Sequence, residues 1–370
     1  MDYYFKTEQM SVGYQGKPLI KDIEIRLRRG EILTLIGPNG AGKSTILKSI
    51  ARQLQMIGGA VYLDQKELAE MSGAELSKRM SVVFTEKLKT ELMTCEDVAA
   101  TGRYPYTGRF GILSKEDRDA VREAMELVHI MEIRDQDFRR ISDGQRQRVM
   151  LARAICQEPE IVILDEPTSY LDVKYKLEFL SILQKLRSQK GLTVIMSLHE
   201  LELAERISDR ILCVKGEYVE RFGTPEEVFC RGYIQSLFDI ETGSFDEENG
   251  SMELEAVKNA DGMEKVFVIA GGGSGRQVYR RLQRQQRAFV TGILFENDLD
   301  YPVARALAEE VIRAEAFEPI SRALLEEAKQ KLDGCERVIC CKEQFGSLEK
   351  ANEELLAYAK AAGKTVERMI

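Results

Sequence analysis

The sequence predicts two α/β domains in tandem, a larger one with a phosphate-binding loop and a smaller, doubly wound one. Three observations carry this prediction. Residues 37–45 read GPNGAGKST, which fits the GxxxxGK[ST] pattern of a phosphate-binding loop. Continuous apolar runs such as IVILD and LTVIMSLH are typical of buried parallel strands. After an acidic, turn-rich stretch, a second alternation of strand and helix patterns begins.

Length and composition set the outer limits of what the chain does. Its 370 residues exceed one ordinary domain, so two domains are expected. The formal net charge is −8 with no long stripe of Lys and Arg, which argues against a nucleic-acid partner. There is no apolar run of about 18 residues and no secretory signal pattern at the N-terminus, so we expect the chain to stay in the cytosol. Seven cysteines without a CxxC pair fit that compartment.

The phosphate-binding loop lies between a strand pattern at residues 32–36 and a helix pattern at residues 46–54. In that setting its glycines let backbone N–H groups face a polyphosphate, and the helix start adds its positive dipole end. Lys43 then reaches the β- and γ-phosphates, and Ser44 binds Mg²⁺. The alternative is a glycine-rich turn before a helix. The predicted nucleotide contacts are Gly37, Pro38, Asn39, Gly40, Ala41, Gly42, Lys43, Ser44 and Thr45.

The first domain is predicted to span residues 1–258 and to combine strands with a helical insert. Short apolar or alternating runs over residues 4–61 indicate strands around the loop. Over about residues 86–158 the pattern becomes helical, as in DRDAVREAMELVHI. Strand patterns then return, and TPEEVF at residues 224–229 has the capping-box spacing of a helix start. We therefore expect a mostly parallel sheet with a helical insert and additional antiparallel strands.

Residues 259–370 are predicted to form a second, doubly wound α/β domain, because strand patterns such as KVFVIA, FVTGILF and RVICC alternate there with helix patterns. GGGSGR at residues 271–276 has the place of a dinucleotide-binding turn, but Arg276 replaces the third glycine. Asp298 and Asp300 follow the next strand only after a turn. The loop either binds a nucleotide or another anion, or it is a tight strand-to-helix turn. We favour a regulatory or docking role for this domain.

Two acids end the apolar run IVILD. Asp165 and Glu166 stand at the carboxyl end of a predicted parallel strand, the edge at which a doubly wound sheet holds its ligand. Asp165 suits the Mg²⁺ shell together with Ser44, and Glu166 suits the activation of an attacking water. A strand that ends in two acids is common by itself. In a chain with a phosphate-binding loop it indicates hydrolysis of a nucleoside triphosphate.

A helix start at ISDGQRQRV carries the first family resemblance. Ser142 has the place of a helix cap with Gln145 at the capping-box spacing, which alone indicates a plain helix start. About 100 residues past the phosphate loop and just before the acidic strand, this segment resembles the LSGGQ signature of ATP-binding cassette (ABC) proteins. The resemblance implies that Ser142, Gly144 and Gln145 contact the γ-phosphate bound by the opposite subunit of a homodimer. The sequence departs from the pattern at Ile141 and Asp143.

Three further segments stand in the order that the cassette has. SYLD at residues 169–172 is similar to the D-loop at the dimer interface, with Asp172 as a predicted contact. His199 resembles the switch histidine that hydrogen-bonds the γ-phosphate. Tyr14 matches the aromatic residue that stacks on adenine, the alternative being a surface turn residue. The predicted catalytic residues are Glu166, His199 and Lys43.

The Q-loop position and the GRYP segment help to decide which branch of the ABC family the chain resembles. The Q-loop glutamine is missing, and Thr85 or Glu86 stands where it would hold the metal, which leaves the coupling role of this loop open. GRYP at residues 102–105 resembles a segment of the importer ATPases for siderophores, haem and cobalamin that faces the permease. The alternative is an ordinary loop at the start of the helical insert.

The resemblance covers roughly residues 2–240 and implies a P-loop NTPase cassette that hydrolyses ATP with Mg²⁺ as a homodimer. It further implies that hydrolysis drives uptake of a metal chelate through a membrane permease, supplied indirectly by an extracytoplasmic binding protein. Such a subunit is cytoplasmic and peripheral on the inner face of the cell membrane. Two alternatives stay open: a soluble cassette ATPase without a permease, and an ATP-gated dimerisation module with little turnover.

Overall fold

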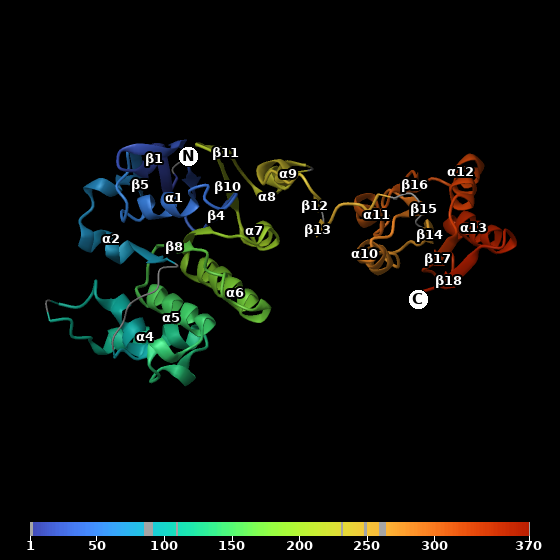
Figure 1. The fold of residues 1–370 in the computed structure, drawn as a ribbon. Helices are drawn as coiled ribbons and strands as arrows, with labels where there is room; N and C mark the ends of the chain where they lie inside the picture. Colours follow the sequence, from blue (N-terminus) through green and yellow to red (C-terminus); the bar gives the residue numbers. More distant parts are fainter. Residues whose placement is uncertain are drawn as a thin grey trace. The chain divides into compact units, whose positions relative to one another are not determined.

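The computed structural model describes residues 3–84, 92–108, 110–230, 232–247, 250–258 and 264–369. The chain forms two compact units, Met1–Phe238 and Asp239–Ile370, each with its own parallel-centred sheet (Figure 1). Among the described residues, no helix combines the length and the apolar character that a membrane crossing needs.

The first unit is built on a sheet of 11 strands within the described residues, in the order β6-β5-β1-β2-β11-β10-β4-β9-β8-β7, with β3 paired to β1. From β10 to β7 neighbouring strands are parallel, and the pairs β1–β2, β1–β5 and β10–β11 are antiparallel. This confirms the predicted parallel sheet with added antiparallel strands. The strands are β1 (Phe5–Tyr14), β2 (Lys17–Ile23), β3 (Arg26–Leu27), β4 (Ile32–Ile36), β5 (Gly58–Leu63), β6 (Lys66–Glu67), β7 (Met80–Val83), β8 (Ile161–Asp165), β9 (Thr193–Ser197), β10 (Arg210–Lys215) and β11 (Tyr218–Gly223).

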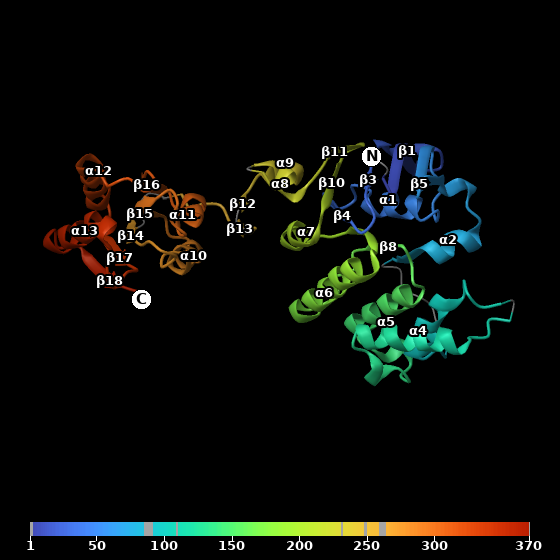
Figure 2. The same ribbon diagram turned by 180° about the vertical axis from the view of Figure 1, so that it is seen from behind.

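The central strands β4, β8 and β9 are buried at every position, as continuous apolar runs require when helices cover both faces of a sheet. Because they are parallel neighbours, their carboxyl ends meet at one edge, where the phosphate loop, Glu166 and His199 follow. Between β7 and β8 the chain forms the predicted helical insert, whose α4 and α5 lie away from β1 and β5 in both views (Figures 1 and 2). The helices of this unit are α1 (Lys43–Ile50), α2 (Gly73–Arg79), α3 (Cys95–Ala100), α4 (Lys115–Leu127), α5 (Asp143–Cys156), α6 (Val173–Lys190), α7 (Leu201–Ile207), α8 (Pro225–Val228) and α9 (Tyr233–Leu237).

The second unit has a fully parallel sheet in the order β16-β15-β14-β17-β18. One apolar core joins the sheet to α12 and α13 and another joins it to α10 and α11, which confirms the doubly wound prediction. The strands are β14 (Val266–Ile269), β15 (Phe289–Phe295), β16 (Glu310–Ala314), β17 (Arg337–Cys340) and β18 (Thr365–Arg368), and the helices are α10 (Arg276–Arg284), α11 (Tyr301–Leu307), α12 (Arg322–Asp333) and α13 (Lys350–Ala361).

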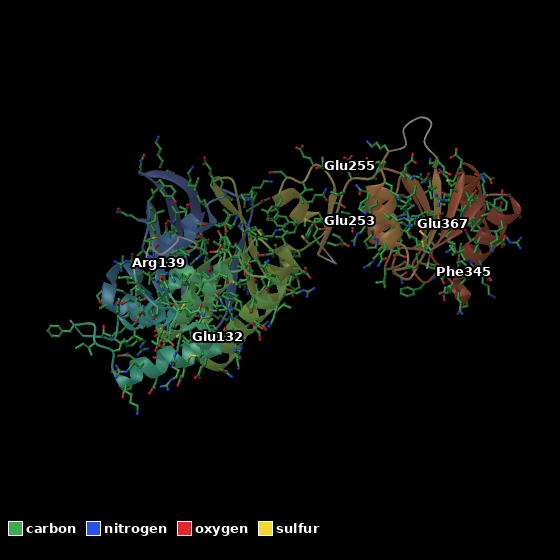
Figure 3. All side chains as sticks on the ribbon, turned by 60° about the horizontal axis from the view of Figure 1, so that its bottom comes forward. Glu132, Arg139, Glu253, Glu255, Phe345 and Glu367 are labelled. Atoms are coloured by element: carbon green, nitrogen blue, oxygen red, sulfur yellow. The ribbon has the colours of Figure 1, made fainter. Side chains whose placement is uncertain are left out.

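A short hairpin of β12 (Ser244–Asp246) and β13 (Ser251–Glu253) precedes this sheet. Glu253, labelled in Figure 3, pairs with Arg280 on α10, and its side chain is only 8% exposed. The hairpin therefore belongs to the second unit. The second unit, Asp239–Ile370, begins about 20 residues before the expected boundary at residue 258. Within the acidic segment, Glu253 uses its carboxylate in a contact with this unit.

Candidate functional site

The phosphate loop joins the buried strand β4 to α1. The helix begins at Lys43, three residues before the apolar pattern indicated, with Gly42 as its cap at φ 96°. Gly37 and Gly40 also have positive φ, 145° and 78°. A Cβ atom at Gly37 would lie 2.1 Å from the carbonyl oxygen of Val214, so only glycine fits this turn. The loop thus has the glycine conformations, and α1 the helix start, that a phosphate-binding loop needs.

Lys43 lies inside this loop. Its Nζ donates to the carbonyl oxygens of Gly37 at 2.7 Å and Pro38 at 3.0 Å, and the side chain is almost completely buried. Burial lowers the pKa of Lys43, and the nearby carboxylates of Glu166 and Asp165 act against that shift. The loop carbonyl oxygens therefore fix the ammonium group inside the loop. Its contact with the β- and γ-phosphates stays a prediction.

Ser44 and Asp165 come together at the edge of the sheet. Ser44 Oγ donates to Asp165 Oδ1 at 3.0 Å, and Asp165 ends the buried strand β8. Ser197 Oγ donates to the same carboxylate oxygen at 2.7 Å. A hydroxyl and a carboxylate oxygen are the hard ligands that Mg²⁺ prefers, so the donor set fits this ion. The sequence did not predict Ser197 as a site residue. The feature that could have indicated it is a polar residue at the end of the otherwise apolar strand pattern LTVIM.

Glu166 and His199 form the second pair that the sequence predicted. His199 Nε2 lies 2.6 Å from Glu166 Oε1, and both side chains are partly exposed. Ser169 Oγ donates to Glu166 Oε2 at 3.3 Å. Glu166 has a left-handed backbone, φ 48°, which turns the chain sharply at the end of β8. The carboxylate is thereby placed at the sheet edge, in reach of solvent.

Glu200, which follows His199, connects this part of the site to Thr168, just before the D-loop, and to α6, and the sequence did not indicate this role. It accepts hydrogen bonds from Thr168 Oγ1 at 2.8 Å and from Lys176 Nζ at 2.6 Å. Burial acts to raise the pKa of Glu200, but the hydrogen bonds from Lys176 and Thr168 outweigh burial, and the pKa is lowered. The carboxylate stays charged and ties the loop that carries His199 to α6.

Tyr14 ends β1 next to the phosphate loop. Its hydroxyl lies 3.3 Å from Thr45 Oγ1, and the side chain is 54% exposed. An exposed aromatic residue at this place has a face available for stacking. Its contact with adenine stays a prediction.

The predicted signature and D-loop lie against each other. Ser142 and Gln145 form the predicted capping box at the start of α5, and Asp143 pairs with Arg146, which balances its charge. A Cβ atom at Gly144 would lie 3.5 Å from the carbonyl oxygen of Tyr170 in the D-loop. Asp172 caps α6 by accepting from the Tyr175 N–H at 3.0 Å. The contacts of Ser142, Gly144, Gln145 and Asp172 with nucleotide stay predictions.

The GRYP segment divides into a buried and an exposed half. A Cβ atom at Gly102 would lie 2.1 Å from the carbonyl oxygen of Arg153, and Arg103 is buried against Asp117. These two residues are buried and anchor the insert. Contact of the segment with a permease stays a prediction. Tyr104 is 58% exposed. Thr85 and Glu86, the candidates for the Q-loop position, lie outside the described residues.

The glycine-rich loop of the second unit uses its donors internally. The N–H of Gly272 donates to Asp298, at 3.0 and 2.9 Å to its two oxygens. The N–H groups of Gly275 and Arg276 donate to Asp300 at 2.9 and 3.2 Å. The chain's own carboxylates thus occupy the position in which a phosphate would bind, and this favours the strand-to-helix turn over an anion site.

Asp300→Ala is expected to lower the free energy of unfolding of the second unit by about 1–3 kcal/mol, because it leaves two N–H groups at the buried start of α10 without their acceptor. Urea unfolding of the full chain, combined with hydrogen exchange of the Gly275 amide, measures the loss. Glu318→Ala, an exposed acid of the same unit, is the matched control. Equal stability of Asp300→Ala and the control would contradict this capping role.

Comparison with known proteins identifies the family. The family described as ABC transporter matches residues 20–169, and the family named MJ0874 matches residues 289–369. The chain is 42% identical over 291 residues to the uncharacterized ABC transporter ATP-binding protein MJ0873 of Methanocaldococcus jannaschii, covering 78% of this chain and 99% of that protein. It is 37% identical over 235 residues to the iron(3+)-hydroxamate import ATP-binding protein FhuC of Bacillus subtilis, covering 64% of this chain and 87% of that protein.

Solved structures agree in fold. A metal-chelate type ABC transporter in an inward-facing conformation matches 68% of this chain and 96% of its own with a TM-score of 0.58 at 23% identity. The dimeric cassette MJ0796, a bacterial ABC transporter cassette, matches 60% of this chain and 98% of its own with a TM-score of 0.54 at 28% identity. On the site geometry and these likenesses, the chain belongs to the ATP-binding proteins of ABC transporters and is an ATPase.

Proposed function

We propose that this chain is the ATP-hydrolysing subunit of an importer for a metal chelate such as a siderophore, haem or a cobalamin-like compound. It works with a membrane permease and binds peripherally to the inner face of the cell membrane. The observation that carries the proposal is the assembled edge of the first sheet, where Lys43, the Ser44–Asp165 pair and the Glu166–His199 pair converge. Relatives named for import of iron(3+)-hydroxamate and ferric enterobactin support the choice of cargo.

In this proposal each side chain of the site has a task in ATP hydrolysis. Lys43 and the loop N–H groups bind the phosphates, and Ser44 and Asp165 would hold Mg²⁺. When bound, this ion neutralises charge on the phosphate oxygens. Glu166 accepts the proton of the water that attacks the γ-phosphorus, as the bond to the ADP oxygen breaks. His199, 2.6 Å from Glu166, orients that carboxylate and hydrogen-bonds the γ-phosphate.

A homodimer completes the site in this proposal. Three exposed apolar residues follow one another here: Tyr170 in the D-loop, at 59% exposure, and Val173 and Leu177, one turn apart at the start of α6, at 75% and 56%. Apolar residues grouped in this way mark an interaction surface. A second copy that covers them would bring its Ser142 toward the first copy's Lys43, with two ATP molecules between the subunits. The solved relative described as dimeric supports this arrangement.

The permease would bind the outer part of the helical insert. Six and eight residues after exposed Tyr104, Phe110 and Ile112 are 88% and 75% exposed. Large apolar side chains that are this exposed indicate a surface that a partner covers. Because Gly102 and Arg103 anchor the base of this segment, its tip is presented on a fixed support.

The double substitution Phe110→Asp with Ile112→Asp is expected to reduce ATP-driven uptake of a ferric hydroxamate into permease-containing vesicles by about tenfold or more, because it removes two apolar contacts. Basal ATP hydrolysis should stay within about twofold, since neither residue lies at the phosphate loop. Leu254→Asp, which changes an apolar residue of 67% exposure outside both proposed docking surfaces, is the control. Unchanged uptake in the double variant would contradict this docking surface. Full ATPase activity without any copurifying permease would favour the soluble alternative.

We propose a regulatory or docking role for the second unit. The support is the occupied glycine loop, which leaves its donors engaged with Asp298 and Asp300. Exposed Leu299, Phe317 and Leu348 follow β15, β16 and β17, and so stand at the carboxyl edge of this parallel sheet. An edge with exposed apolar side chains fits contact with another macromolecule better than it fits chemistry on a nucleotide.

A further inference from the structure

We propose that Ser197 is a positioning residue for ATP hydrolysis, which sets the carboxylate of Asp165 and the backbone of Glu166 relative to each other. The inference rests on the proposed roles of these two acids in the ATPase site. It concerns a residue outside the phosphate loop, the signature and the switch histidine.

Ser197 uses its hydroxyl in both directions. Its Oγ donates to Asp165 Oδ1 at 2.7 Å and accepts the backbone N–H of Glu166 at 2.9 Å. The side chain is completely buried at the end of β9, and Ser197 is the direct register partner of Asp165 on β8. A hydroxyl has one donor and two acceptor positions, so one serine satisfies two buried partners. The sheet fixes the serine, and the serine fixes both acids.

The two contacts have different consequences. Asp165 Oδ1 also accepts from Ser44, so two hydroxyls define the orientation of that carboxylate. Ser44 belongs to the nucleotide-binding loop, whereas Ser197 belongs to the rigid sheet and keeps its place whatever the loop binds. The bond to the Glu166 N–H holds the backbone where φ reaches 48°. That turn aims the Glu166 carboxylate at His199, which follows Ser197 by two residues.

A second buried serine of the same sheet shows what a serine without a positioning role looks like. Ser81 on β7 is equally buried, at 1% exposure, and its Oγ has no hydrogen-bond partner among the described residues. Ser81 thus fills space in the same sheet without orienting an acid. The contrast between the two serines supplies the matched control. Groups that orient the ligands of a metal change metal affinity or activity by about 10–100-fold when removed.

The test compares Ser197→Ala, Ser197→Thr and Ser81→Ala in the full chain. Ser197→Ala is expected to lower kcat by about 10–100-fold, with the KM for ATP within about twofold. In the Glu166→Gln background, where turnover is strongly reduced, the affinity for Mn²⁺ measured by electron paramagnetic resonance with ATP should fall by about tenfold. Ser197→Thr keeps the hydroxyl and should restore kcat and Mn²⁺ affinity to within about threefold of wild type. Ser81→Ala should leave both unchanged.

The outcomes separate this proposal from the proposed function. If wild type hydrolyses ATP and Ser197→Ala matches it in kcat and Mn²⁺ affinity, the positioning role is wrong and the ATPase site stands. If Ser197→Ala loses kcat and Ser197→Thr fails to recover it, the serine has a packing role only. If Ser197→Ala lowers Tm by more than about 8 °C, Ser197→Cys takes its place under the same criteria. Absence of turnover in wild type would overturn the function itself.

Discussion

Glu166→Gln is expected to lower the rate of ATP hydrolysis by about 10²–10⁴-fold while the affinity for ATP changes by less than about twofold. The amide has nearly the shape of the carboxylate but cannot accept the proton of an attacking water. Its oxygen can still meet His199 Nε2, which lies 2.6 Å from Glu166 Oε1, so the geometry of the pair is kept. The loss therefore isolates proton transfer from binding.

Two measurements check this expectation. Steady-state phosphate release gives the rate, and equilibrium titration with a fluorescent ATP analogue gives the affinity. Glu202→Gln, three residues past His199 on α7, carries the same change at an exposed ion pair with Arg206 and should hydrolyse ATP at the wild-type rate. Equal rates in wild type and Glu166→Gln would reject the assigned mechanism and favour a dimerisation module with little turnover.

The same variant tests the composite site. With hydrolysis blocked, ATP should hold two copies together, so Glu166→Gln should elute as a dimer with ATP and as a monomer without it. Changing Gly144 to a bulky residue should prevent that dimer, because Gly144 lies in the signature that would face the nucleotide of the other copy, and a large side chain would project into that interface. A Cβ atom itself would make only an ordinary contact, 3.5 Å, with the Tyr170 carbonyl oxygen. A monomer in both conditions would contradict the shared site.

The sequence predicted the elements and the first site residues because their chemistry is local. Glycines at a strand-to-helix turn, acids at the end of an apolar run and the Ser142 cap are each defined by neighbours within a few positions. Ser197 and Glu200 could not be found in this way. Their function comes from partners on another strand or helix, Asp165 and Lys176, which only the fold places beside them.

Two segments of the second unit also show what local sequence patterns cannot predict. GGGSGR has the composition of an anion-binding turn. Whether its N–H groups are available to an anion depends on Asp298 and Asp300, which are 26 and 25 residues from the glycines that they contact. The composition of the acidic segment before the sheet predicts a domain boundary, because acidic residues usually stay in solvent. One of them, Glu253, is nevertheless buried, because Arg280 on α10 pairs with its carboxylate.

Arg103→Ala is the second large expectation, and it concerns stability. Arg103 Nε donates to Asp117 Oδ1 at 2.9 Å, and Nη1 donates to the Cys156 carbonyl oxygen at 2.7 Å and to Glu158 at 2.8 Å. The side chains of Arg103 and Asp117 are each only 7% exposed. Removing one partner of a buried pair leaves an unpaired charge, so the free energy of unfolding should fall by about 3–5 kcal/mol. Chemical unfolding of the full chain measures this loss, and Arg118→Ala, an exposed arginine on α4, is the control.

The pH dependence of that loss identifies its cause. The Ser114 backbone N–H and the Arg103 guanidinium lower the pKa of Asp117, so its stabilising effect is present above the pKa of the unfolded chain and is lost as pH falls through the folded value. Without Arg103, protonation removes the unpaired negative charge of the buried Asp117 carboxylate. The difference between wild type and Arg103→Ala should therefore shrink as pH falls below about 4. Adding Asp117→Asn to Arg103→Ala should recover part of the stability at pH 7, because it removes the orphaned charge. A loss that is independent of pH and of Asp117→Asn would instead assign the effect to the packing of the guanidinium on Tyr106, whose ring centroid lies 4.0 Å away.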